Sequence, residues 1–247
     1  MRHRHLAALL CTLPMALPVA AQIPDTFTNL KVFPTDVARG ELIGSMRNFS
    51  MSLGVRCVHC HVGPADGSLQ GADFASDEKE TKETARKMLR MVQAINGDHL
   101  SQVGTDIEVA CFTCHRGASR PSRLEDELFA AWRAGGPDSL LAGYRGLRKA
   151  YYGRAIFDFG DQTLMNAAAL MGTPANGVSG TLGAVAALSL ETELFPEYAP
   201  GWTQLAGALV RSGDTTAALT AIRKADELAP GNPQIQRLLQ QIQGNRP

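Results

Sequence analysis

Two short motifs hold the residues best suited to chemistry in this chain. Residues 57–61 read Cys-Val-His-Cys-His, and residues 111–115 read Cys-Phe-Thr-Cys-His. In each motif two thiols stand three positions apart, and an imidazole follows the second thiol directly. This C-x-x-C-H pattern is the attachment signature of c-type haem. Two thiols bond the vinyl groups on one porphyrin edge, and the next imidazole ligates the iron from below.

The motifs therefore predict two covalently bound haem c groups. The predicted attachment residues are Cys57, Cys60, Cys111 and Cys114, and the predicted iron ligands are His61 and His115. Three alternatives use the same residue types. An exported chain permits a disulfide within each motif, paired C-x-x-C motifs can bind zinc, and C-x-x-C in a βαβ context is a redox motif.

Each iron also needs a sixth ligand or an open position, and the helix before the first motif offers a methionine. Residues 36–53 predict a helix capped by Thr35 or Asp36 and ended by Gly54. Its apolar positions follow helical spacing: Leu42, Ile43, Met46, Phe49 and Leu53. Met46 lies on this face, whereas Met51 lies off it and closer to the motif. His59 sits inside its own motif and cannot easily reach its own iron.

A second helix is predicted over residues 77–96, capped by Ser76 and ended by Gly97. Its apolar stripe comprises Ala85, Met88, Leu89, Val92 and Ile95. Met88 and Met91 both precede the second motif. Periodicity alone leaves open whether either one packs in the core or ligates the iron. His99, between this helix and the motif, is a further candidate ligand.

Residues 37–121 resemble the cytochrome subunit of purple-bacterial photosynthetic reaction centres. The resemblance rests on the segments SLGVRC (52–57), RKMLRMVQAIN (86–96) and CFTCHRG (111–117), with shorter matches at 46–47 and 74–76. That family builds each half as helix, C-x-x-C-H, helix, C-x-x-C-H, and most of its haems take a helix methionine as sixth ligand.

The resemblance implies that Met46 ligates the first iron and that Met88, rather than Met91, ligates the second. This chain has one such half, so two haems are expected where the family has four. One haem of the family takes a histidine from elsewhere in the subunit, and the missing half puts such a ligand in doubt here. Histidine–methionine ligation generally raises the reduction potential relative to two histidines, and filled positions argue against chemistry at iron.

The last third of the chain matches the 34-residue tetratricopeptide pattern over residues 199–232. The positions that carry the match are Trp202, Leu205, Ala206, Leu209, Ala218, Ile222, Ala225 and Pro230. A looser copy precedes it, with a first helix near 164–171, a loop at 172–180, and Ala184, Leu188 and Pro196 at the repeat offset. Residues 233–243 predict a capping helix. Such repeats either bind partner proteins or only stabilise the neighbouring module.

The fold is predicted to be mainly α: a dihaem c-type cytochrome module followed by a helical-hairpin, tetratricopeptide-like module. The expected ranges are a signal peptide at 1–21, the dihaem domain at 22–121, a helical linker at 122–152 broken at Gly135-Gly136-Pro137, and repeats at 153–247. Loss of residues 1–21 leaves 22 basic and 24 acidic residues, a net charge of −2. Without a basic patch, nucleic acid is not an expected partner.

The N-terminus predicts export to the periplasm. Arg2 and Arg4 precede a short apolar run, and the small residues at 19–21 suit cleavage before Gln22. The alternative is an uncleaved anchor at the outer face of the inner membrane. The predicted function is electron transfer between redox proteins, in photosynthesis or respiration. The repeats or a membrane redox complex are the predicted docking places for a partner. A peroxidase-like dihaem enzyme with one open iron and a redox-responsive scaffold are the alternatives.

Overall fold

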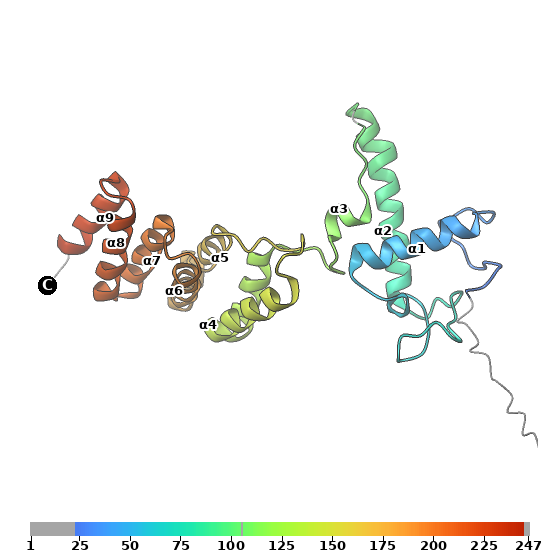
Figure 1. Ribbon diagram of the computed structural model, residues 1–247, viewed down its shortest axis with the longest axis horizontal. Coiled ribbons are helices and arrows are strands. Elements are labelled where there is room, and N and C mark those ends of the chain that lie inside the picture. Colours follow the sequence, from blue (N-terminus) through green and yellow to red (C-terminus); the bar gives the residue numbers. More distant parts are fainter. Residues whose placement is uncertain (1–22, 105, 245–247) are drawn as a thin grey trace, which may run out of the picture. The chain divides into compact units, whose positions relative to one another are not determined.

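The computed structural model describes residues 23–104 and 106–244 of the chain. Two compact units make up the protein, residues 1–113 and residues 114–247. All regular secondary structure in the described residues is helical. The one β-type pairing there is an isolated bridge between Val62 and Asp73. Figure 1 shows the succession of helices. The prediction of a mainly α fold is confirmed.

The N-terminal unit is built on two helices and the loops between them. Its elements are α1 (Arg39–Leu53), a 3₁₀ turn (Cys57–His59), α2 (Glu80–Ala94), a π turn (Ile95–His99), a 3₁₀ turn (Leu100–Gln102) and the start of α3 (Cys111–His115). α1 ends as predicted at Gly54, which adopts the left-handed conformation with φ 66°. The next residue, Val55, donates its N–H to the Ser50 carbonyl at 3.0 Å and so closes the helix end.

Both helices begin later than their sequence patterns predict. α1 starts at Arg39 without a side-chain cap, and α2 starts at Glu80. The residues before α2 form a loop. The Lys82 ammonium holds this loop by donating hydrogen bonds to the backbone carbonyls of Phe74, Ala75 and Ser76 at 2.7–3.0 Å. Gly97 does not end the helix, since the chain continues through it as the π turn.

The C-terminal unit is a succession of packed helices. They are α4 (Leu124–Tyr151), α5 (Thr163–Met171), a 3₁₀ turn (Pro174–Asn176), α6 (Gly177–Leu194), α7 (Ala199–Ser212), α8 (Thr215–Leu228) and α9 (Pro233–Gly244). α4 is interrupted at Gly135 and Gly136, where the sequence predicts a break. Each helix from α5 to α9 packs against the next, and α4 packs against both α5 and α6.

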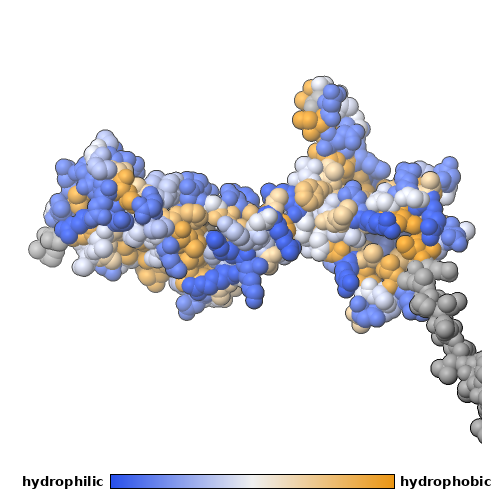
Figure 2. Space-filling view, in the orientation of Figure 1, coloured by the Kyte–Doolittle hydropathy of each residue, from blue (hydrophilic) through white to orange (hydrophobic). Residues whose placement is uncertain are grey.

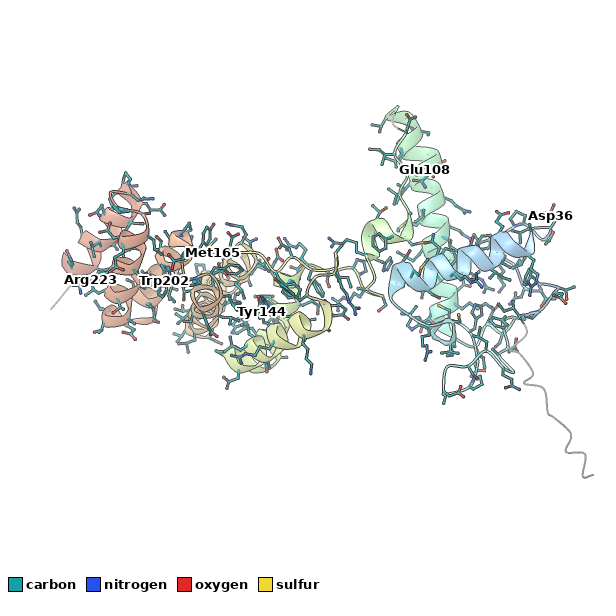
Figure 3. The ribbon with its side chains drawn as sticks, in the orientation of Figure 1. Asp36, Glu108, Tyr144, Met165, Trp202 and Arg223 are labelled. Atoms are coloured by element: carbon teal, nitrogen blue, oxygen red, sulfur yellow. The ribbon has the colours of Figure 1, made fainter. Side chains whose placement is uncertain are left out.

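One continuous apolar core runs through this C-terminal unit. The segment expected as a linker contributes to it, because Leu124, Leu128, Trp132, Leu140 and Tyr144 of α4 are all buried. Figure 3 labels Tyr144 on α4. The predicted repeat positions Leu205, Ala206, Leu209, Ala218, Ile222 and Ala225 are buried too. Trp202, labelled on α7 in Figure 3, donates its indole N–H to the Pro196 carbonyl at 2.8 Å and joins the two repeats.

The predicted signal peptide, residues 1–21, lies outside the described residues. Among the helices that the structure does describe, none has the length and apolar character needed to cross a membrane.

Candidate functional site

The first motif folds into a single helical turn directly after α1. His59 N–H bonds the Arg56 carbonyl at 2.9 Å, and His61 N–H bonds the Cys57 carbonyl at 3.0 Å. In such a turn residues i, i+3 and i+4 share a face. Cys57, Cys60 and His61 have that spacing, so the turn presents two thiols and one imidazole on one side.

The His61 imidazole is held beside an aromatic ring. Its centroid lies 5.1 Å from that of Phe74, in an edge-on arrangement. Burial lowers the pKa of His61 below its usual value, and the nearby Lys82 charge lowers it further. The nearby Phe74 backbone offsets part of this lowering of the pKa. His61 Nδ1 nevertheless has no hydrogen bond to any described residue. This lowering of the pKa favours the neutral imidazole, the form that ligates a metal.

The second motif forms the short helix α3. Cys111 is half-buried, Cys114 is exposed and Phe112 is 50% exposed. His115 Nδ1 lies 2.9 Å from the Ala118 carbonyl, which fixes the ring when Nδ1 carries the proton. That tautomer leaves Nε2 as the free nitrogen for a metal. Arg116 and Gly117 both have positive φ, and they turn the chain so that the Ala118 carbonyl reaches back to the ring.

Among the described residues, neither motif holds a disulfide in this structure. Over the same residues, no three side chains of the His, Cys, Asp or Glu type gather where they could share a metal ion. Burial raises the pKa of the Cys60 thiol, and the Thr81 hydroxyl and the Lys79 charge partly offset this effect.

α1 distinguishes the two methionines near the first motif. Helix geometry places Met46 on the same side as Leu42, which is 5% exposed, and near Phe49 and Leu53. Met46 is half-buried. Met51 points to the opposite side and is 69% exposed. The structure thus sets Met46 on the apolar face that the sequence predicts and Met51 off it.

α2 has an inverted distribution of side chains. The face that the protein buries is cationic, with Lys82 9% and Arg86 6% exposed. Arg86 pairs with Asp77 at 2.7 Å, and its guanidinium also donates to the Asn29 carbonyl at 3.1 Å. Asp77 also bonds Lys31 and Asn29, and these partners hold the pKa of its carboxyl far below the usual range.

The opposite face of α2 carries the apolar stripe. Helical spacing places Ala85, Met88, Val92 and Ile95 there, away from Arg86. Met88 is 36% and Met91 44% exposed. Figure 2 shows apolar surface over α1 and along the outer part of α2. A helix normally turns its apolar face toward the core, so this partly exposed stripe is suited to a further apolar contact.

Sequence reasoning did not identify Lys82, Arg86 or Phe74 as parts of this site. Cations are rarely buried unless paired, so nothing in the sequence of α2 singles out Lys82 and Arg86 for the interior. Their spacing of four residues, on the side opposite the apolar stripe, is the one signal that could have indicated a shared role.

Comparison with known proteins identifies two regions. The family model described as "Photosynthetic reaction centre cytochrome C subunit" matches residues 62–127, and a tetratricopeptide repeat model matches residues 199–242. The resemblances drawn from the sequence are thus confirmed for both parts of the chain. The cytochrome match contains the whole second motif and begins just after the first.

Two curated relatives share the cytochrome region. The photosynthetic reaction center cytochrome c subunit of Roseobacter denitrificans is 39% identical over 70 residues, covering 28% of this chain and 18% of that protein. The subunit of the same name from Thermochromatium tepidum is 30% identical over 115 residues, covering 44% of this chain and 25% of that protein. The chain therefore spans a quarter or less of these relatives. No solved structure matches it significantly.

Proposed function

We propose that this chain is a c-type cytochrome that carries two covalently attached haems and transfers electrons between redox partners. The observation that carries the proposal is the pairing of two C-x-x-C-H turns with two helices, α1 and α2, that each carry a methionine on a partly exposed apolar face. Similarity to reaction-centre cytochrome subunits supports the same class of function.

The residues fit a covalently held haem at each motif. At the first motif, one turn presents two thiols and a neutral imidazole, and α1 supplies a half-buried methionine. At the second, the His115 ring is fixed by a backbone carbonyl and α2 supplies an exposed methionine stripe. A haem c group, when bound, supplies one-electron oxidation and reduction of its iron.

Each of the eight predicted site residues has a defined part in this proposal. The four cysteines of the two motifs anchor the groups, and His61 and His115 ligate the irons. Met46 and Met88 would be the methionine ligands and would favour the reduced state, because thioether ligation raises the reduction potential. Iron held in this way would be closed to oxygen and peroxide, which would favour electron transfer over peroxidase chemistry.

The proposal includes export to the periplasm, where c-type haem is attached, with or without retention at the membrane. Electron donor and acceptor are redox proteins. The repeats of the C-terminal unit offer a docking surface for one of them, since such helical arrays commonly bind proteins.

Replacement of the ligand methionines tests this function. Met46→Leu and Met88→Leu should each open one iron, remove about half of the far-red methionine-to-ferric-iron band and lower one midpoint potential. Met51→Leu and Met91→Leu are matched controls and should leave the spectrum unchanged. Carbon monoxide should bind rapidly to the reduced ligand variants but not to the wild type. Rapid binding by the wild type would favour a dihaem enzyme with one open iron.

A further inference from the structure

α2 is tied at its N-terminal end to the first motif. The Thr81 hydroxyl donates to the His59 carbonyl at 2.6 Å, and the Lys79 ammonium donates to the Val58 carbonyl. Both acceptors are the central residues of the motif, between Cys57 and Cys60. The first turn of α2 therefore holds the backbone from which both thiols and His61 project.

The other end of α2 is tied to the chain that enters the second motif. Asn96, in the π turn that prolongs α2, donates its side-chain amide to the Val109 carbonyl at 2.9 Å. In return, Val109 N–H donates to the Asn96 side-chain oxygen at 2.9 Å. The Asn96 side-chain amide thus bonds both the N–H and the carbonyl of Val109, as a neighbouring strand would. It holds Val109 next to the end of α2.

The residue after Val109 is bonded to the start of α3. Ala110, the next residue, donates its N–H to the Thr113 hydroxyl at 3.0 Å, and Thr113 N–H returns a bond to the Ala110 carbonyl at 3.0 Å. This reciprocal pairing resembles a capping box and sets where α3 begins. Cys111, the first residue of the second motif, is therefore positioned from Asn96 through two adjacent residues.

We propose that α2 is a rigid strut that positions the first haem-attachment motif and the start of the second, with Thr81 positioning the first motif and Asn96 positioning Cys111. This inference rests on the proposed function. The two anchors stand 15 positions apart, about 20 Å of helix, and Met88 lies between them. One helix then fixes Cys57–His61, Met88 and Cys111 in a single frame. Electron exchange between two centres depends steeply on their separation, so a rigid strut keeps that exchange constant.

The test replaces one anchor at a time. Thr81→Val keeps the shape of the side chain and removes the hydroxyl, and Asn96→Ala removes both bonds to Val109. Each variant serves as the control for the other. Haem-to-protein ratio, the methionine–iron band and the two midpoint potentials from a redox titration are the readouts. Met46→Leu and Met88→Leu assign each potential to its haem.

We expect two haems per chain in both variants, because the cysteines are untouched. Asn96→Ala should lower the potential that Met88→Leu assigns to the second haem and remove about half of the methionine–iron band. Thr81→Val should lower the other potential, and Thr81→Ser, which keeps the hydroxyl, should restore it. Asn96→Asp keeps the acceptor for Val109 N–H, so its potential should fall between those of Asn96→Ala and wild type.

A purely structural role would lower the unfolding temperature and leave the potentials and the band unchanged, and that result would overturn the proposal. Both potentials moving together in each variant would also overturn it, since the two anchors would then not act separately. A wild-type ratio below two haems would instead contradict the proposed function and is read before any variant is made.

Discussion

The two units of this protein bury very different kinds of side chain. In the C-terminal unit, leucines, isoleucines, alanines and aromatic residues form one continuous core. In the described part of the N-terminal unit, Leu42 is the only buried apolar residue, and the interior holds Ser52, Lys82 and Arg86 instead. The C-terminal unit can therefore fold by removing apolar surface from water. The N-terminal unit buries little apolar surface, and the methionine-bearing faces of α1 and α2 stay partly exposed. Under the proposed function, these faces would pack against bound haem.

The largest expected effect comes from removing the first attachment site. The double change Cys57→Ser and Cys60→Ser should prevent haem attachment there and leave the N-terminal unit open to proteases, while the C-terminal unit stays folded. Limited proteolysis with mass spectrometry measures this difference. His59→Gln, an exposed change within the same motif, should keep both haems and protect both units. Equal protease resistance of the double variant and the wild type would contradict the contrast between the units.

The converse change is a substitution in the apolar core of the C-terminal unit. Leu140 is fully buried in that core. Leu140→Ala should cost about 2–5 kcal/mol of unfolding free energy, because it removes buried methyl groups and leaves a cavity. Chemical denaturation followed by circular dichroism measures the cost, and Leu182→Ala, at a side chain 49% exposed, is the control. The haem spectrum should stay unchanged, and a spectral loss at Leu140→Ala would mean that the units do not fold separately.

A buried acid makes the stability of the same unit depend on pH. Glu191 on α6 is fully buried, and neither carboxylate oxygen has a hydrogen-bond partner among the described residues. Burial, with the Asp161 charge, raises its pKa from 4.5 to about 7. Because the unfolded state loses this proton at lower pH than the folded state, stability should fall as pH rises from about 4.5 to above 7. The loss is on the order of 3 kcal/mol.

Glu191→Gln should flatten that dependence, since the amide does not ionise. Urea unfolding at pH 5 and pH 8 measures the difference for both proteins, and Glu193→Gln, at an exposed neighbouring position, serves as control. A wild-type stability that is equal at the two pH values would refute the assignment of Glu191 as a buried acid.

The smallest effect is expected at a helix cap. The Asp214 carboxylate accepts the Ala217 N–H at 2.9 Å and caps α8. Asp214→Ala should destabilise the C-terminal unit by about 1 kcal/mol. Thermal unfolding detects a change of this size, and Glu193→Ala, at an exposed position of α6, tests whether loss of any carboxylate has the same effect.

Much of this contrast could be predicted from the sequence. Helical periodicity located α1, α2 and the paired helices of the repeats, because apolar spacing directly reflects burial on one face. The glycine after α1 fixed its end, since few other residues adopt a left-handed conformation. The C-x-x-C-H motifs located the candidate site, because their chemistry depends on neighbours within five residues.

Other features depend on contacts between distant residues and escaped prediction. Lys82 bonds carbonyls of the loop before α2, where the sequence pattern predicts that the helix has already begun. Asn96 bonds Val109 at the other end of α2. The segment around Leu128 and Tyr144 joins the C-terminal core because α5 and α6 cover it. Glu191 occupies a position where its repeat pattern favours a small residue, and its burial follows from the close approach of Gly201 on α7.

An absorption spectrum of the purified protein, oxidised and reduced, with a haem-to-protein ratio, tests the central claim most directly. The account predicts two covalently bound, low-spin haems per chain and a far-red methionine-to-ferric-iron band in the oxidised state. A protein that folds both units with no covalently bound haem would contradict it.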